Sequence, residues 1–301
     1  MPLALKHFFQ ELDKLNLSPS TIRELIQAYA GIKICRTFAS DDQLLDLIPL
    51  FEQFDLHVAF SSKKTLFIPD QNKGGFSNQP GQMIPATLNI GSYSIYVGQD
   101  PVQVKNALDN EELGLDFEFG NQLKIPACCI SFYEKYYQQA SEKQTDFLPF
   151  SFSSTPDSWP FDPLTNMVPQ YFGYSLNSFF PCNFKCEHAS RVGSEVEKLL
   201  RTVDPCFADE FMRYQRMNYL YTEYDGVFGL EGSIFQDQVL KYNKKFLKGT
   251  ATGVVWSALI RGNQIRILTK NHYLIQNDDQ ILLDLEGDLV ALLIFSENNE
   301  D

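Results

Sequence analysis

The sequence has 301 residues, of which 44% are hydrophobic and 21% charged, a composition that argues against a disordered chain. Its formal net charge of −13 argues against nucleic acid and membranes as partners, because both attract basic rather than acidic surfaces. Aromatic residues are frequent, with 25 Phe and 14 Tyr, and such rings stabilise cores and interfaces. We therefore expect a globular protein with a large core and with aromatic surface suited to a homo-oligomer.

The N-terminal third is predicted to mix helices and strands. Apolar residues at helical spacing predict three helices, over 4–16, 20–29 (with Ser20 as N-cap) and 42–54 (with Ser40 or Asp41 as N-cap). Three short β-type runs follow, at 57–60, 65–69 and 88–97, with a loop over 70–81. Asp100 and Pro101 then predict a further helix, which continues to Glu112.

The middle of the chain is predicted to be mostly helical, and the C-terminal part to be rich in strands. Helices are expected over 126–139, 186–203 and 205–220. Between the first two lies a segment with six prolines and many aromatic residues, 147–181, which is too irregular for a helix. Two hairpins are expected after residue 221, formed by 252–260 with 264–268 and by 272–275 with 280–285, and 289–295 is expected to close the same sheet.

These elements predict an α+β fold, with a helical centre that carries the cysteine motifs and a mainly antiparallel C-terminal β-sheet. The expected regions are 1–120, 121–220 and 221–301, joined in one interlocked unit because no clear linker separates them.

The chemically distinctive feature is a pair of cysteine motifs. Cys128-Cys129 follows Pro126, and Cys182-x-x-x-Cys186 follows Pro181. Both motifs are predicted at helix N-termini, where the helix dipole favours a thiolate, and a thiolate is both a metal ligand and a nucleophile.

If the two motifs meet, they can hold a metal. We expect Cys182, Cys186 and one of Cys128 and Cys129 to bind zinc or an iron–sulfur cluster, with His188 as a fourth ligand. Only one of the adjacent cysteines is expected to bind, because successive side chains on a helix point about 100° apart.

Such a centre would act on a small-molecule substrate if the protein is an enzyme, with the aromatic segment 147–181 covering the site. Two other hypotheses remain open. One is a metal-free thiol enzyme with Cys182 or Cys129 as nucleophile, and the other is a non-enzymatic binding or assembly protein. Cysteine also packs as a small hydrophobic residue, which is what we expect of Cys35 and Cys206 and what remains the alternative for the clustered four.

The remaining signals concern location. Residues 1–7 show no apolar run followed by a small-residue cleavage site, which predicts no signal peptide. The longest apolar run, Leu289 to Phe295, is far shorter than the roughly 18–20 residues of a membrane helix. We therefore expect a cytoplasmic protein whose cysteines are thiols or metal ligands rather than disulfides.

The two motifs also carry a resemblance. Gly114–Phe132 resembles a Gly-(Tyr/Ile)-Pro-x-Cys-Cys-x-x-Phe signature, and Asn177–Gly193 resembles a Pro-Cys-x-x-x-Cys-x-x-Ser signature. In this order and spacing, the pair resembles a little-characterised family of archaeal and bacterial proteins, over about a third of the chain. The chain departs from the pattern at Lys124-Ile125 and around Glu187-His188, so the resemblance gives His188 no role, and it implies no particular reaction.

Overall fold

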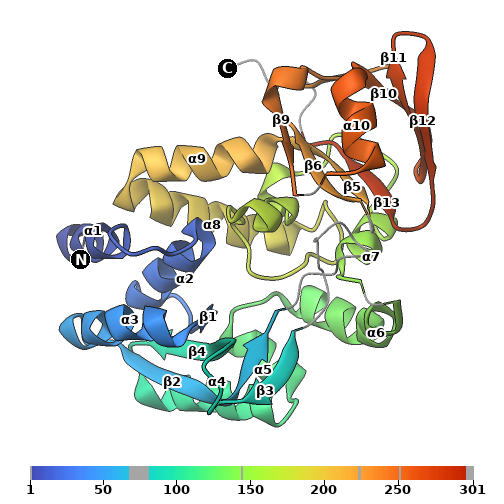
Figure 1. Ribbon diagram of the computed structural model, residues 1–301. Helices are drawn as coiled ribbons and strands as arrows, with labels where there is room; N and C mark the ends of the chain where they lie inside the picture. The colour runs from blue at the N-terminus through green and yellow to red at the C-terminus, as the bar shows by residue number, and fades with distance from the viewer. Residues whose placement is uncertain (1, 68–80, 144, 223–224, 251, 296–301) are drawn as a thin grey trace. The chain divides into compact units, whose positions relative to one another are not determined.

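The computed structural model describes residues 2–67, 81–143, 145–222, 225–250 and 252–295. They form ten α-helices and three antiparallel sheets, which confirms the predicted α+β class (Figure 1). Among these helices, none is long and apolar enough to cross a membrane. The chain divides into two compact units, one made of 2–67, 81–135 and 194–209, and the other of the described residues within 136–193 and 210–295.

The first unit begins with three helices, α1 (Pro2–Leu12), α2 (Pro19–Tyr29) and α3 (Asp41–Gln53). The predicted N-cap of α2 is wrong, because Ser18 rather than Ser20 caps it and accepts a hydrogen bond from the Thr21 N–H, with Pro19 at the first helical position. Ser40 forms a capping box with Gln43 at the start of α3, as one of the two predicted caps.

A four-stranded sheet of order β1-β4-β2-β3 follows, built from β1 (Cys35–Ala39), β2 (His57–Leu66), β3 (Gln82–Pro85) and β4 (Ser92–Gly98). Two of the predicted runs are one strand, β2, which is interrupted by an irregularity between Phe60 and Lys64. Strands β1 and β3 were not predicted. The expected loop over 70–81 lies outside the described residues except at Gly81.

Helix α4 (Pro101–Glu112) starts as predicted, with Asp100 as its N-cap, and contacts β2 and β4. Glu111 on this helix accepts hydrogen bonds from the Arg36 guanidinium at 2.6 Å and from the Tyr96 hydroxyl at 2.5 Å. This arrangement ties α4 to β1 and β4. Burial, together with the neighbouring Glu111 carboxylate, raises the pKa of the Tyr96 hydroxyl.

The helical middle of the chain is also confirmed. It comprises α5 (Asp116–Gln122), α6 (Ala127–Lys143), α7 (Leu148–Ser153), α8 (Glu187–Val203) and α9 (Pro205–Arg216). The predicted helix over 205–220 ends at Arg216, because strand β5 (Asn218–Thr222) begins two residues later. Helix α5 was not predicted.

The second unit holds two sheets. One has the order β13-β5-β6-β9, adding β6 (Gly226–Leu230), β9 (Leu247–Gly249) and β13 (Val290–Leu293) to β5. The other has the order β12-β11-β10-β8-β7, from β7 (Ile234–Gln236), β8 (Val239–Lys241), β10 (Gln264–Thr269), β11 (His272–Asn277) and β12 (Gln280–Glu286). The β11–β12 hairpin is the second predicted hairpin. The last strand, β13, pairs with β5, so the expected single sheet is two sheets.

The first predicted hairpin is wrong, because residues 252–260 do not form a strand. Val254–Arg261 is helix α10, which lies against β11 and β12 (Figure 1). Its buried residues Val255, Ala258 and Leu259 share one helical face, and this apolar stripe outweighs the β-propensity of the two valines.

The proline-rich segment 147–181 is ordered by packing. It contains α7 and two 3₁₀ turns, η2 (Pro163–Thr165) and η3 (Val168–Phe172), separated by extended chain. Its apolar side chains form one core with the residues of β5, β6 and β13, including Leu148, Phe152, Phe161, Val168, Tyr219, Tyr221, Val227, Ala291 and Leu293.

A substitution at Gly193 on α8 can test how this segment packs against the helix. A Cβ at this position would lie 2.4 Å from the Leu164 carbonyl oxygen, so the helix backbone is in close contact with η2. We expect Gly193→Ala to lower the free energy of unfolding by about 1–3 kcal/mol, although alanine favours helices, because the methyl group overpacks the contact.

Urea unfolding followed by circular dichroism measures this change. Glu195→Ala, at an exposed site on the same helix, is the matched control and should stay within about 0.5 kcal/mol of the original protein. A Gly193→Ala variant as stable as the control would contradict the close packing of α8.

Candidate functional site

The first cysteine motif lies in the first turn of α6. The Pro126 carbonyl oxygen accepts hydrogen bonds from the Cys129 N–H at 2.8 Å and from the Ile130 N–H at 3.0 Å. Cys128 and Cys129 therefore lie in the first turn of the helix, where the helix dipole favours negative charge.

Helix α5 fixes the approach to this motif. The Ile125 N–H donates to the Gly120 carbonyl oxygen at 2.9 Å, and Lys124 has a left-handed backbone with φ of 58°. A Cβ on Gly120 would lie 2.8 Å from the Ile130 Cδ1, so only a glycine lets α5 pack this closely on α6. Pro126 is held at the start of α6 by this contact.

The second motif is a hydrogen-bonded loop that leads into α8. The Asn183 side-chain oxygen accepts from the Lys185 N–H at 2.9 Å, and the Asn183 carbonyl accepts from the Cys186 N–H at 3.2 Å. The Cys186 carbonyl in turn accepts from the Ser190 N–H at 2.9 Å, which makes Cys186 the N-cap of α8. The Asn183 side-chain N–H donates to the Cys182 sulfur at 3.5 Å.

Phe184 anchors this loop in the core of its unit. Its side chain is fully buried and lies 5.8 Å from the Phe161 ring and 5.6 Å from the Phe295 ring, measured between centroids. The Phe184 N–H donates to the Thr155 hydroxyl at 2.9 Å, and its carbonyl accepts from the Thr165 hydroxyl at 2.9 Å. The middle one of the three residues between the cysteines therefore has both its side chain and its backbone fixed.

One further hydrogen bond holds the residue before the motif. The Ser151 hydroxyl donates to the Pro181 carbonyl oxygen at 2.6 Å. Ser151, Thr155 and Thr165 all belong to the proline-rich segment, which we expected to cover the cysteines. The contacts observed for that segment instead support the backbone of the cysteine loop.

The four motif cysteines form one group. The sulfur atoms of Cys128, Cys129, Cys182 and Cys186 all lie within 4.8 Å of one another, and the four could hold a metal ion. The Cys128 and Cys129 sulfurs are 3.9 Å apart, so both adjacent cysteines face the group, whereas we expected only one to do so.

The chemistry of the group is that of a thiolate metal site. In a tetrahedral zinc site with Zn–S bonds of about 2.3 Å, neighbouring sulfurs lie about 3.8 Å apart. The Cys128 and Cys129 sulfurs are 3.9 Å apart, and no pair in the group is farther apart than 4.8 Å. Cys129 and Cys186 are buried, Cys182 is partly exposed and Cys128 is exposed.

The other predicted site residues lie elsewhere. His188 is exposed in the first turn of α8 and is not among the described residues that form the group able to hold a metal. Cys35 is buried as expected, and burial raises the pKa of its thiol. The prediction for Cys206 is wrong, because this residue is exposed near the start of α9, where only its neighbours on the other helical face reach the core.

Several supporting residues escaped prediction. Thr155, Thr165 and Phe184 act through contacts with residues far away in the sequence, which no local pattern reveals. Asn183 could have been identified from the sequence, because Asn favours Asx turns, in which its side-chain oxygen accepts from the backbone N–H two residues on.

Comparison with known proteins gives no further assignment: no family model, no curated protein and no solved structure matches this chain.

The two remaining cysteines give a direct test of these environments. In the folded protein, we expect iodoacetamide to modify Cys206 rapidly and Cys35 slowly near pH 7. Cys35 is inaccessible, and its raised pKa leaves little thiolate at that pH. Quenched time points analysed by peptide mass spectrometry measure both rates. In denaturant the two rates should become similar, and equal rates in the folded protein would contradict the burial of Cys35.

Proposed function

We propose that this protein binds one Zn²⁺ ion through the thiolates of Cys128, Cys129, Cys182 and Cys186. The observation that carries the proposal is the mutual distance of at most 4.8 Å among the four sulfurs. Four thiolates on one divalent ion leave a net negative charge, which the N-termini of α6 and α8 offset. The Asn183 side-chain N–H adds a hydrogen bond to the Cys182 sulfur, of the kind that orients metal ligands.

A single ion fits these distances better than a four-iron cluster. In a cluster each cysteine binds a different iron, so the sulfurs lie farther apart than the edge of one tetrahedron. Cysteine-only tetrahedral ligation is typical of zinc among the redox-inactive metals. The iron–sulfur alternative is therefore tested in the same experiment, by iron and acid-labile sulfide.

Four protein ligands favour a structural role for the ion. Catalytic zinc sites keep a position open for water or substrate, whereas sites with four cysteines are closed. The ion would hold the two cysteine motifs in their folded arrangement, in a compartment reducing enough to keep the thiols available, such as the cytoplasm. The resemblance to the family with paired cysteine motifs agrees with a shared site but adds no reaction.

A metal-free thiol enzyme is the second candidate, because one cysteine has a nearby hydrogen-bond donor and solvent access. Cys182 is partly exposed and accepts the Asn183 N–H, which would stabilise a thiolate. Cys129 fits this function less well, since it is buried.

Metal analysis separates these functions. Protein purified without air should contain one zinc per chain, and Cys182→Ser should lose it. Cys206→Ser, which removes an exposed cysteine outside the group, should keep the full amount. Elemental analysis with a sulfide assay measures both, and thermal unfolding with and without a chelator should show a lower midpoint for the metal-free protein.

The alternatives give different results in this experiment. Iron and acid-labile sulfide in stoichiometric amounts would contradict the zinc site and indicate an iron–sulfur cluster at the same cysteines. A folded protein without metal, in which iodoacetamide modifies Cys182 at the same rate with and without chelator, would contradict metal binding and favour the thiol enzyme.

Asn183 offers a finer test. Asn183→Asp keeps the oxygen that accepts from the Lys185 N–H, but it replaces the donor to the Cys182 sulfur with negative charge. We expect the zinc affinity to fall about tenfold, at the lower end of the range that is typical when a hydrogen bond to a metal ligand is lost. Competition with a chromophoric chelator measures the affinity, and an unchanged midpoint of thermal unfolding in chelator shows that the loop itself is intact. Unaltered affinity would exclude a role for this hydrogen bond.

A further inference from the structure

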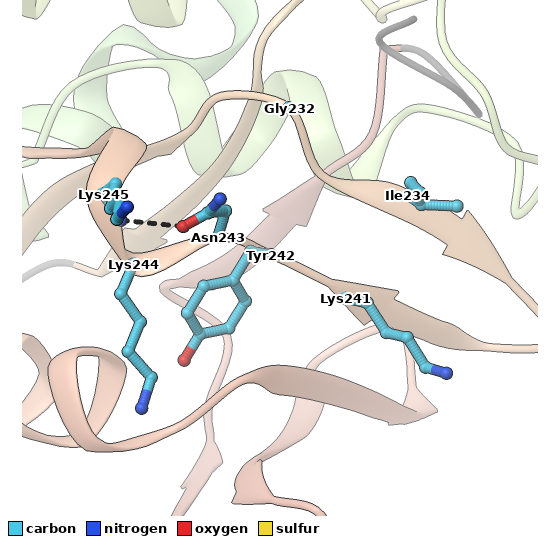
Figure 2. A pocket seen from close by; sticks show the side chains of 7 residues that line it. All are labelled: Gly232, Ile234, Lys241, Tyr242, Asn243, Lys244 and Lys245. Atoms are coloured by element: carbon cyan, nitrogen blue, oxygen red, sulfur yellow. Dashed lines mark hydrogen bonds between the residues drawn. The ribbon is translucent and has the colours of Figure 1, made fainter.

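The second unit carries a groove that has no part in the cysteine site. Its volume is about 570 Å³, and it is lined by residues from the end of β8, the turn after it and the start of β7 (Figure 2): Gly232, Ile234, Lys241, Tyr242, Asn243, Lys244 and Lys245. In the sequence, only Lys244 and Lys245 are adjacent. In the fold, Lys241 joins them in the lining of the groove, and Ile234 lies opposite Lys241 because the two residues pair between β7 and β8.

The groove is positively charged in an otherwise acidic protein. Three of its seven lining residues are lysines and none is acidic, whereas the chain as a whole has a formal net charge of −13. All three lysines are exposed. Among the described residues, none forms an ion pair with them, and the Lys244 ammonium donates to the Arg261 carbonyl oxygen at 3.1 Å, a contact that leaves its charge uncompensated.

The acidic residues nearest in the sequence do not pair with these lysines. Glu231 precedes Gly232 and lies 3.6 Å from the Arg213 guanidinium and 3.8 Å from the Lys248 ammonium. Asp237, in the turn between β7 and β8, forms no ion pair with the lysines among the described residues. The charge of the lysines is therefore available to a ligand.

The backbone of the groove is fixed while its lysine side chains diverge. The buried Tyr242 donates its hydroxyl to the Leu259 carbonyl at 2.9 Å, and the Asn243 side-chain oxygen accepts from the Lys245 N–H at 3.0 Å. Figure 2 shows the three lysine side chains leaving this frame in different directions. A compact anion such as phosphate needs donors that converge on one point, so the arrangement suits negative charges spread along an extended ligand.

One feature of the groove favours a polypeptide as that ligand. Ile234, at the start of β7 and opposite Lys241, is 44% exposed and offers an apolar contact beside the lysines. A polypeptide can match this contact with an apolar side chain and the lysines with carboxylates, whereas nucleic acid would gain from the charge but not from Ile234.

We propose that this groove binds an extended acidic segment of a partner protein, with an apolar side chain on Ile234 and carboxylates facing Lys241, Lys244 and Lys245. The interaction is electrostatic at an exposed surface, so it is weak and falls with ionic strength. It is independent of the metal site and goes beyond the function proposed above.

Fluorescence anisotropy with the full chain tests the proposal. The probe is a short labelled peptide of alternating acidic and apolar residues, at low salt and at about 0.15 M ionic strength. We expect binding at low salt that weakens with salt, and an affinity about tenfold lower for the triple variant K241Q/K244Q/K245Q. Ile234→Asp should weaken binding as well, because it places a like charge beside the peptide.

A matched control separates the groove from net charge. The variant K6Q/K63Q/K198Q removes the same total charge from exposed lysines elsewhere and should bind the peptide as the original protein does. Circular dichroism confirms that both triple variants are folded. Equal loss in both variants, no binding at low salt, or tighter binding of a single-stranded oligonucleotide or inorganic polyphosphate than of the peptide would overturn the proposal.

Discussion

The cysteine loop depends on one buried residue, Phe184. Its ring lies between Phe161 and Phe295, and its N–H and carbonyl are both hydrogen-bonded to hydroxyl groups of the proline-rich segment. A residue held by both its ring and its backbone cannot shift without leaving polar groups unpaired in the core. The flanking Cys182 and Cys186 therefore have defined positions before any ligand binds, which is the condition for a site with fixed geometry.

The proline-rich segment explains why such an anchor is needed. A loop of three residues between two cysteines has few contacts of its own, so its conformation must come from its surroundings. Prolines limit the backbone freedom of the segment, and its rings fill the space over β5 and β13. The segment is thus the support of the loop, and its irregular path follows from the hydroxyl and ring contacts it has to supply.

Both cysteine motifs stand at helix starts, but different means fix them. At α6 a close glycine contact, Gly120 against Ile130, places the first turn. At α8 the Asn183 turn makes Cys186 the N-cap. In each case the cysteines lie at a helix N-terminus, where the helix dipole favours the thiolate state that a metal ligand requires. The positive groove beside β7 is a separate feature of the second unit.

Much of the fold and the outline of the site could be predicted from local signals. Asp100 with Pro101 marked α4, Ser40 marked α3, and the cysteine spacing identified every member of the group that could hold a metal. These signals act between residues a few positions apart, where capping hydrogen bonds and backbone restriction depend on the sequence itself.

Only the tertiary structure decided which segments pair and which residues support the site. Residues 252–260 have the composition of a strand, yet they form α10 because their apolar face packs on β11 and β12. Contacts between distant residues likewise determine that β13 pairs with β5 and that Phe184 is buried. They also determine that Cys128 and Cys129 both belong to the cysteine group. The free energy of such contacts comes from packing and loop closure over the whole chain, and no short stretch of sequence carries that information.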